Sequence, residues 1–395
     1  MKKNISIKIY APTGEFLKEW FNFQFVGFSK AINAGVGECR IVLLEKFDYS
    51  GIELLGGNLA TITISDTDTT TTDGGPRVIY SGYVSQYAPT INDNGIELIY
   101  VTLLGHYTKL IDILKSGANT NLYTDSTDRN GLKTASGAAA TEIAYVMNAI
   151  ITRYQAETTT PQIFALSIPE TGQDLNYIFK QKTYREALDI ALSACPDGYF
   201  WYVNELGGFT LKQKSSTSKH IFMLGKHFNN ITVTNNIENI YNVVLIWNGL
   251  TGGSAIYKSY SDAVSIAQYG RRPYRITDKG IQGSDTADNI AAKFLAEHKD
   301  PDIQVSCTII DNNIDAINGY DIESIEPGET CRFIGFNEAG SYLLRDAMLI
   351  TRVDYSLESV TLTIENFKTD IVSQAQRLQD QVGSIESDTI PDSYT

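Results

Sequence analysis

The histidines are the side chains best suited to bind a metal ion or move protons in this chain, and their spacing supports neither role. They stand far apart and form no HExxH or HxH pattern: His106, His220, His227 and His298. A zinc site is usually announced by two such ligands close together in sequence. We therefore predict no metal site, and structural or surface roles for all four histidines.

One acidic pair has a spacing that could serve catalysis. Asp321 and Glu323 are two residues apart in an expected strand, so both would lie on one face. A pair of carboxylates is the arrangement with which glycosidases cleave sugars. Carboxylates at the edge of a strand more commonly stay in solvent, where they also deter aggregation. The second interpretation is favoured for this pair.

Residues 125–131 have the Asp-rich and Asn-rich composition of a calcium-binding loop. Aligned on Gly131, however, the first and twelfth positions of an EF-hand fall on Ser126 and Gly137, where Asp and Glu are needed. The chain also lacks a P-loop, a dinucleotide-binding glycine pattern and a GxSxG nucleophile elbow. We predict no catalytic residue, no cofactor-binding residue, no metal ligand and no cofactor.

The cysteines and the N-terminus indicate a protein made in a cytoplasm. No two cysteines form a CxxC pair, so four reduced thiols are expected: Cys39, Cys195, Cys307 and Cys331. The first residues alternate apolar and polar side chains rather than forming the continuous apolar core of a signal peptide. No stretch approaches the ~18 apolar residues of a membrane-spanning helix.

The length and charge of the chain bound its class. A chain of 395 residues is too long for one ordinary core, so two to four domains are expected. The net charge of −14 argues against a protein that grips nucleic acid, which needs a basic surface. An acidic balance is compatible with a channel through which DNA slides without adhering.

The elements that would position any site begin with a β region over residues 1–112. Ile5, Ile7 and Ile9 alternate with polar residues. Further strands are expected at residues 38–44, 60–64, 78–84 and 96–103. The Asn94-Gly95 pair predicts a hairpin between the last two of these strands. A flexible hairpin is expected at residues 67–76.

Residues 113–228 have the pattern of an α+β insert. Apolar residues recur at helical spacing from about residue 138 to residue 155. A second helix should begin at Thr183, which forms a capping box with Glu186 and precedes an apolar face. Residues 199–203 and 209–212 should follow as a hairpin.

Residues 229–370 return to a strand pattern interrupted by one helix at about residues 285–298. Residues 320–333 are expected to form a strand, a Pro-Gly turn and a second strand. Residues 371–395 should form a short helix with a heptad seam of about two repeats and then a disordered tail. The predicted fold is therefore α+β, mainly β: two β-barrel or sandwich domains, an α+β insert between them and a short C-terminal helix.

Four segments together resemble the baseplate hub family of long-tailed bacteriophages, also called the tail-associated or prophage tail protein N-terminal module. They are the strand at residues 80–85, the helix and hairpin at residues 184–211, the opening of the second β region at residues 239–244, and the helix at residues 285–298 with residues 321–329 and the closing pair of strands. Their order and spacing over roughly residues 1–370 carry the resemblance.

The resemblance implies a structural virion protein at the tail tip, assembled in the bacterial host cytoplasm. In such hubs two tail-tube-like barrels per chain let a homotrimer continue a hexameric tail tube, close its distal end and form part of the DNA-ejection channel. The implied partners are the distal tail protein ring, the tail tube protein, the C-terminus of the tape-measure protein, and a central fibre or receptor-binding protein. DNA would be present only in transit.

Two other functions fit parts of the sequence. Some relatives of this family are tail-tip enzymes that degrade peptidoglycan, but the chain lacks a recognisable set of catalytic residues. A carbohydrate-binding receptor adhesin would use exposed aromatic side chains, whereas most aromatic residues here alternate within expected strands, as core residues do. The sequence therefore favours the structural, non-enzymatic role.

Overall fold

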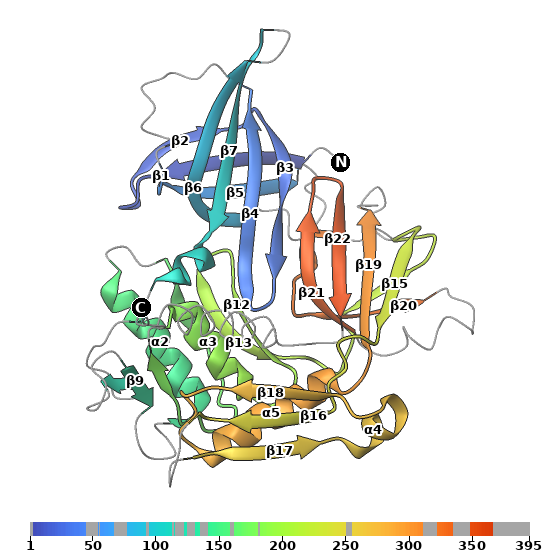
Figure 1. Cartoon of the computed structure of the whole chain (residues 1–395). Helices are drawn as coiled ribbons and strands as arrows, with labels where there is room; N and C mark the ends of the chain where they lie inside the picture. The colour runs from blue at the N-terminus through green and yellow to red at the C-terminus, as the bar shows by residue number, and fades with distance from the viewer. Residues whose placement is uncertain are drawn as a thin grey trace, which may run out of the picture.

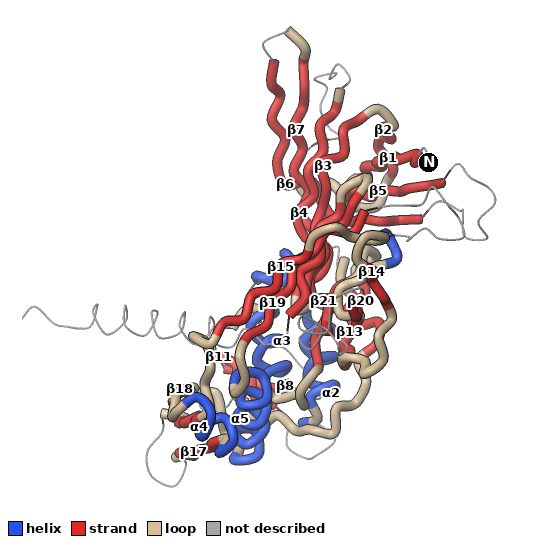
Figure 2. Tube along the Cα trace, turned by 90° about the vertical axis from the view of Figure 1, so that its right-hand side faces the viewer, coloured by secondary structure: helices blue, strands red, loops and turns tan. Residues whose placement is uncertain are grey.

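The computed structural model describes residues 3–365, apart from 45–53, 55, 67–76, 92–94, 113, 115–121, 125–130, 135–140, 159–161, 181, 250–254, 311–321 and 335–347. Most strands gather at one end of the molecule and most helices at the other (Figures 1 and 2). The expected hairpin at residues 67–76, the calcium-like loop at residues 125–130 and the C-terminal helix at residues 371–395 lie outside the described residues.

In its described residues the first β region contains seven strands, followed by a 3₁₀ helix. Its alternating isoleucines do face a core, since Ile7 and Ile9 are fully buried. The expected hairpin near residue 95 is confirmed, because β6 and β7 pair from Gly82 to Ile91. The elements are β1 (Lys3–Tyr10), β2 (Phe16–Trp20), β3 (Phe23–Ala31), β4 (Ala34–Leu43), β5 (Leu59–Asp66), β6 (Arg77–Ile91), β7 (Glu97–Gly105) and η1 (His106–Ile111).

The second β region is built from strands that are far apart in sequence. They are β15 (Ile231–Asn236), β19 (Asp302–Ile310), β20 (Thr330–Ile334), β21 (Met348–Tyr355) and β22 (Ser359–Glu365), with β14 (His220–Met223) parallel to β20. Their inward-facing residues share one hydrophobic core with those of the first region. Where a first strand was expected within residues 320–333, the described residues form a short 3₁₀ helix instead, η3 (Ile322–Ser324).

The two β regions contain the same five-stranded unit. The first unit consists of β3 to β7, ordered β3-β4-β7-β6-β5 in the sheet, and the second is ordered β15-β19-β22-β21-β20. Numbered along the chain, both orders read 1-2-5-4-3, and all neighbours in both units are antiparallel. The fourth strand also carries a bulge in each unit, after Val84 in β6 and after Ile350 in β21.

The two units join edge to edge into one sheet. β21 pairs antiparallel with β3, from Arg352 opposite Ala31 to Tyr355 opposite Phe28. The sheet then runs from β15 to β2, and within the described residues it does not close into a barrel. The mainly-β α+β class predicted from the sequence is confirmed, whereas a closed barrel is not found in this part of the chain.

The helical end combines two separate stretches of chain around one core. The first stretch contains α2 and α3, and the second contains β16 to β18 and α5. The elements are β8 (Leu122–Thr124), β9 (Gly131–Thr134), α2 (Ile143–Glu157), β10 (Phe164–Ser167), β11 (Ile178–Lys180), α3 (Tyr184–Ser193), β12 (Tyr199–Val203), β13 (Gly208–Gln213), β16 (Val243–Trp247), β17 (Tyr257–Ser261), α4 (Ala263–Tyr269), β18 (Pro273–Thr277) and α5 (Ser284–His298).

Residues 243–298 therefore differ from the sequence expectation, which placed them in the second β domain. Strands β16, β17 and β18 form a sheet of their own, and α5 packs between this sheet and α3 (Figure 1). The expected single helix is present as α5, but α4 precedes it. Short apolar strands have no local feature that selects their sheet, so the pattern alone could not assign them.

The capping box predicted from the sequence is present at the start of α3, and its contribution to stability can be tested. The Thr183 hydroxyl accepts from the Glu186 N–H at 3.1 Å, and the Glu186 carboxylate accepts from the Thr183 N–H at 2.8 Å. We expect Thr183→Ala to lower the free energy of unfolding by about 1 kcal/mol, because the Glu186 N–H loses its side-chain acceptor. Urea denaturation should show it, and Thr183→Ser should behave like the wild type.

Candidate functional site at the junction of the two β units

The junction between β3 and β21 depends on a glycine that lets two backbones approach closely. Gly27 has a φ of 144°, and a Cβ atom there would lie 2.4 Å from the carbonyl oxygen of Tyr355. Phe28, the next residue, stacks on the Tyr355 ring with 4.8 Å between ring centroids. The ladder continues with the Ile32 N–H, which donates to the Thr351 carbonyl at 3.0 Å. Only glycine fits this position without moving a strand.

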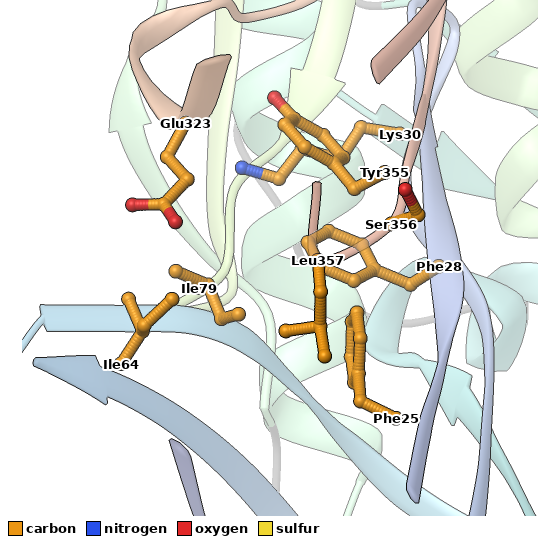
Figure 3. Close-up of a pocket in the computed structure, with 9 residues that line it drawn as sticks. All are labelled: Phe25, Phe28, Lys30, Ile64, Ile79, Glu323, Tyr355, Ser356 and Leu357. Atoms are coloured by element: carbon orange, nitrogen blue, oxygen red, sulfur yellow. The ribbon is translucent and has the colours of Figure 1, made fainter. Parts of the chain in front are cut away.

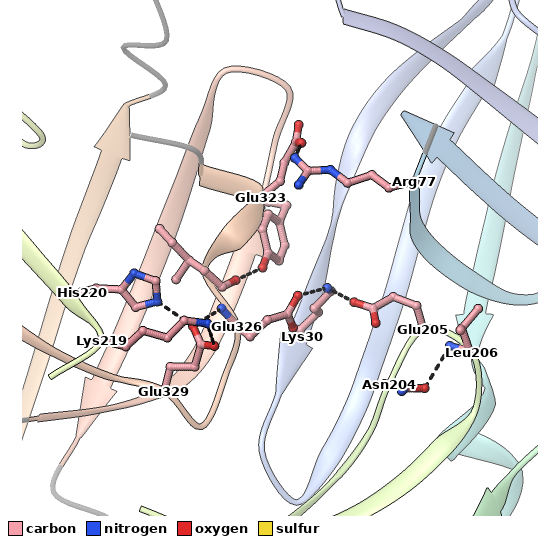
Figure 4. Close-up of polar contacts among 12 residues, drawn as sticks. Lys30, Arg77, Asn204, Glu205, Leu206, Lys219, His220, Glu323, Glu326 and Glu329 are labelled. Atoms are coloured by element: carbon pink, nitrogen blue, oxygen red, sulfur yellow. Dashed lines mark hydrogen bonds and ion pairs between the residues drawn. The ribbon is translucent and has the colours of Figure 1, made fainter. Parts of the chain in front are cut away.

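A buried lysine ties three segments together beside this ladder. Lys30 of β3 reaches Glu326, before β20, at 2.8 Å, and it also pairs with Glu205 in the β12–β13 turn (Figure 4). The Lys30 side chain is only 4% exposed. Burial opposes the charge on the ammonium, but the two carboxylates outweigh it and hold the pKa of Lys30 above its ordinary value. Lys30 also lies 5.3 Å from the centroid of the Tyr355 ring.

The Pro-Gly turn singled out in the sequence forms the far side of this cluster. Gly328 has a φ of 88°, and a Cβ atom there would lie 2.3 Å from the ring of Phe200. Its N–H donates to the Ile350 carbonyl at 2.7 Å, which fixes the turn against β21. Burial raises the pKa of Glu326 despite the neighbouring Lys30. The turn is therefore held by backbone geometry as well as by charge.

Glu329 anchors the other end of the turn. Its carboxylate contacts Nε2 of His220 at 2.5 Å, pairs with Lys219 and accepts from the Glu326 N–H at 3.1 Å. Burial alone would raise the pKa of Glu329, but these hydrogen bonds outweigh it and hold the pKa below its ordinary value. The stability that Glu329 contributes is thus present above about pH 4.3 and is lost as the pH falls through the lowered pKa.

The lowered pKa of Glu329 predicts that substituting this residue has an effect on stability that depends on pH. Glu329→Gln should lower the free energy of unfolding by about 1 kcal/mol at pH 7, because a charge-assisted contact becomes a neutral one. The difference from the wild type should shrink as the pH falls from about 4.3 through the lowered pKa of the folded state, where the wild-type carboxyl also becomes neutral. Denaturant midpoints measured from pH 7 to pH 3 check this. A difference that stays constant over that range would contradict it.

A small cavity adjoins the junction, and it is too small for a substrate. Its volume of about 20 Å³ is that of a single water molecule. The wall includes Glu323 of η3, which pairs with Arg77 of β6 and so adds another contact between the two β regions. The lining residues are Phe25, Phe28, Lys30, Ile64, Ile79, Glu323, Tyr355, Ser356 and Leu357 (Figure 3).

His220 and His227 both lie near the Phe222 ring, whereas His106 and His298 lie on other elements of the fold. His106 Nε2 lies 3.0 Å from the Ser81 hydroxyl, and burial lowers the pKa of this histidine to about 4. His227 accepts from the Met223 N–H, and His298 packs against Phe294. The described residues contain no cluster of three or more His, Cys, Asp or Glu side chains that could hold a metal ion. All four cysteines are free and buried.

Sequence reasoning paired Asp321 with Glu323, but Asp321 lies outside the described residues and Glu323 contacts Arg77. It missed the cluster of Lys30, Glu205 and Glu326, in which the two glutamates lie 175 and 296 residues after Lys30 in the sequence. One local signal existed, because Lys30 occupies an inward-facing position of an alternating strand. Such a lysine needs a buried partner, although the sequence does not say which.

The whole architecture has counterparts among solved structures. The 43 kDa tail protein of prophage MuSo2 from Shewanella oneidensis matches with a TM-score of 0.61 and 14% identity, covering 92% of this chain and 98% of that one. This chain shares the fold of phage tail proteins. A tail protein from Neisseria meningitidis matches at 0.59 and 12% identity, covering 93% of this chain and 98% of its own.

A third counterpart is the prophage tail protein gp18 from Listeria monocytogenes, at a TM-score of 0.54 and 12% identity, covering 95% of this chain and 98% of that one. No protein-family model matches the sequence, and no curated protein matches it either. The similarity to tail proteins is thus a similarity of fold. None of the helices in the described ranges is long and apolar enough to cross a membrane.

Proposed function

We propose that this chain is a structural protein of a bacteriophage tail and that three copies form a baseplate hub at the tail tip. The observation that carries the proposal is the repeated five-stranded unit with its 1-2-5-4-3 strand order. Two similar units in each of three copies would present six similar surfaces, and such a ring can stack on a six-fold tube. The shared fold with phage tail proteins supports the same role.

In this role the trimer closes the distal end of the tail tube and forms part of the channel for DNA ejection. The net charge of −14 would keep DNA from adhering to the channel wall while it passes. The proposed division is a first β domain over residues 1–112, a second over residues 229–370 and an α+β region between them, to which residues 243–298 also contribute. The role is structural, with no enzymatic step.

The proposed partners follow from a place at the tube end. One face of the ring would meet the tail tube protein and the distal tail protein ring. The axis would hold the C-terminus of the tape-measure protein before ejection, and the outer face a central fibre or receptor-binding protein. The protein would be made and assembled in the host cytoplasm before it becomes part of the virion tail tip.

Electron microscopy of intact particles carrying an antibody label on this chain tests the location. We expect the label at the tail tip. A label along the tail shaft or on the head would contradict the proposal. The mass of the purified chain in solution, measured by analytical ultracentrifugation, tests the trimer separately.

A further inference from the structure

Among the described strands, each five-stranded unit leaves one backbone edge without a neighbouring strand. β15 ends the sheet and pairs only with β19 among the described strands. On β6, the ladder with β5 ends at Tyr83 and hydrogen bonds to Gly57 and Asn58 extend this side to Val84, whereas the ladder with β7 continues to Ile91. No other described strand extends along β6 beyond Tyr83 on the side of β5. The molecule therefore has two separate strand edges able to accept a further strand.

The chain already contains one junction between two such edges. In the strand order 1-2-5-4-3, β3 is the first strand of its unit and β21 is the fourth strand of the other unit. Their pairing joins the first strand of one unit to the fourth strand of the next. The two remaining edges are of the same two kinds, because β15 is a first strand and β6 is a fourth strand.

The registers of the strand pairs show which residue of the first unit corresponds to which residue of the second unit. In the first unit one row crosses four strands through Gln86, Thr102, Arg40 and Gly27. In the second unit the row that starts at the matching bulge contains Arg352, Thr363, Ser306 and Thr232. Gln86 thus corresponds to Arg352, and Gly27 corresponds to Thr232.

Counting two residues along each strand extends the correspondence. Ala88 corresponds to Asp354, and Thr234 corresponds to Ser29. Asp354 and Ser29 lie opposite each other in the existing β21–β3 ladder. A junction of the same geometry between two copies would therefore place Ala88 of one copy opposite Thr234 of the other.

We propose that β15 of each copy pairs antiparallel with β6 of the next copy, from about residue 85 to residue 89, and so repeats the β3–β21 junction between chains. This inference rests on the proposed trimer and names the surfaces that would hold it together. A head-to-tail contact of this kind closes into a ring when its rotation is right. Junctions within and between chains would then alternate around the ring.

The composition of the two edges agrees with pairing. Soluble proteins usually protect an exposed edge with lysine, proline or another charge. Residues 231–236 contain no charged residue and no proline, and residues 85–91 contain no charged residue. Pro89 lacks an N–H group, so the new ladder should end there. Pro89 corresponds to Tyr355, the residue at which β21 ends.

A cysteine pair tests the predicted register. Hydrogen-bonded and non-hydrogen-bonded residue pairs alternate along an antiparallel ladder. Because Ile32 and Thr351 form a hydrogen-bonded pair, Ser29 and Asp354, three positions along, form a non-hydrogen-bonded pair. The Cα atoms of such a pair are about 4.5 Å apart, which suits a disulfide. We expect Ala88→Cys with Thr234→Cys to form disulfides between chains on oxidation, giving species up to a trimer on a denaturing gel. Ser29→Cys with Asp354→Cys is the benchmark within one chain, and the four native cysteines are buried.

Further controls separate this proposal from the proposed function. Each single cysteine variant, and Ala88→Cys with Val233→Cys, should give no such ladder, because adjacent residues of a strand face opposite sides. A trimer in ultracentrifugation without the Ala88–Thr234 disulfide would overturn the junction and leave the trimer standing. A monomer without the disulfide would overturn both. A ladder that continues past three chains would show an open filament and contradict ring closure.

Discussion

Replacing Gly27 with alanine should lower the free energy of unfolding by about 2–6 kcal/mol. The new methyl group would meet the Tyr355 carbonyl oxygen at 2.4 Å, so β3 or β21 must move. Crowding a packed site costs about 1–3 kcal/mol. Holding alanine at a φ of 144° adds about 1–3 kcal/mol of backbone strain. Urea denaturation measures the total.

Hydrogen exchange locates the damage. The Ile32 N–H and the β21 amides that face β3 should lose protection in Gly27→Ala, while the α3 amides keep theirs. Gly14→Ala is the matched control, because Gly14 also has a positive φ, 90°, but no atom within 4 Å of the added Cβ. It should cost only the backbone strain. Equal losses in the two variants would show that close approach at the junction is unimportant.

Replacing Lys30 with methionine should lower the free energy of unfolding by about 2–4 kcal/mol. Methionine keeps most of the volume of the lysine stem but leaves Glu205 and Glu326 facing one another without their shared cation. Removing one partner of a buried ion pair costs about 3–5 kcal/mol, and the partial exposure of Glu326, 32%, reduces this figure. Thermal and urea denaturation at pH 7 provide the measurement.

Two comparisons show whether charge causes the loss. Adding Glu205→Gln and Glu326→Gln to Lys30→Met should restore most of the stability, because the repulsion disappears. Lys258→Met is the surface control: Lys258 pairs with Asp288 at 2.5 Å, with both side chains about a third or more exposed, and should cost less than about 1 kcal/mol. If the Lys30 and Lys258 variants lost the same stability, burial of the Lys30 cluster would have no energetic role.

The contribution of Lys30 to stability depends on pH in the opposite direction to that of Glu329. Because the pKa of Lys30 is raised on folding, its stabilisation is present below about pH 10.4 and is lost as the pH rises through the raised pKa. The wild type should therefore lose its advantage over Lys30→Met at strongly alkaline pH.

Local patterns predicted the individual elements well. The capping box at Thr183 starts α3, the helical spacing before residue 155 forms α2, and the alternating isoleucines of β1 face the core. These features depend on neighbours within a few residues, so a single sequence contains the information.

Contacts between residues far apart in the chain could not be predicted from the sequence. Nothing local assigns β16 to the helical core rather than to the second β region, and nothing local links Lys30 to Glu326. The register of β3 on β21 depends on Gly27, whose small size is visible in the sequence while its neighbour is not. Contacts across hundreds of residues are decided by how all elements pack together.

The split of the second β unit has a consequence for synthesis on the ribosome. β15 leaves the exit tunnel well before its neighbour β19, because residues 237–301 must be translated in between. At about 5–20 residues per second this wait lasts several seconds. During that time β15 lacks its partner β19, so nascent chains on one polysome could exchange strands. Early docking of the helical end around α5 would shorten the delay by bringing β15 and β19 together as soon as the latter emerges.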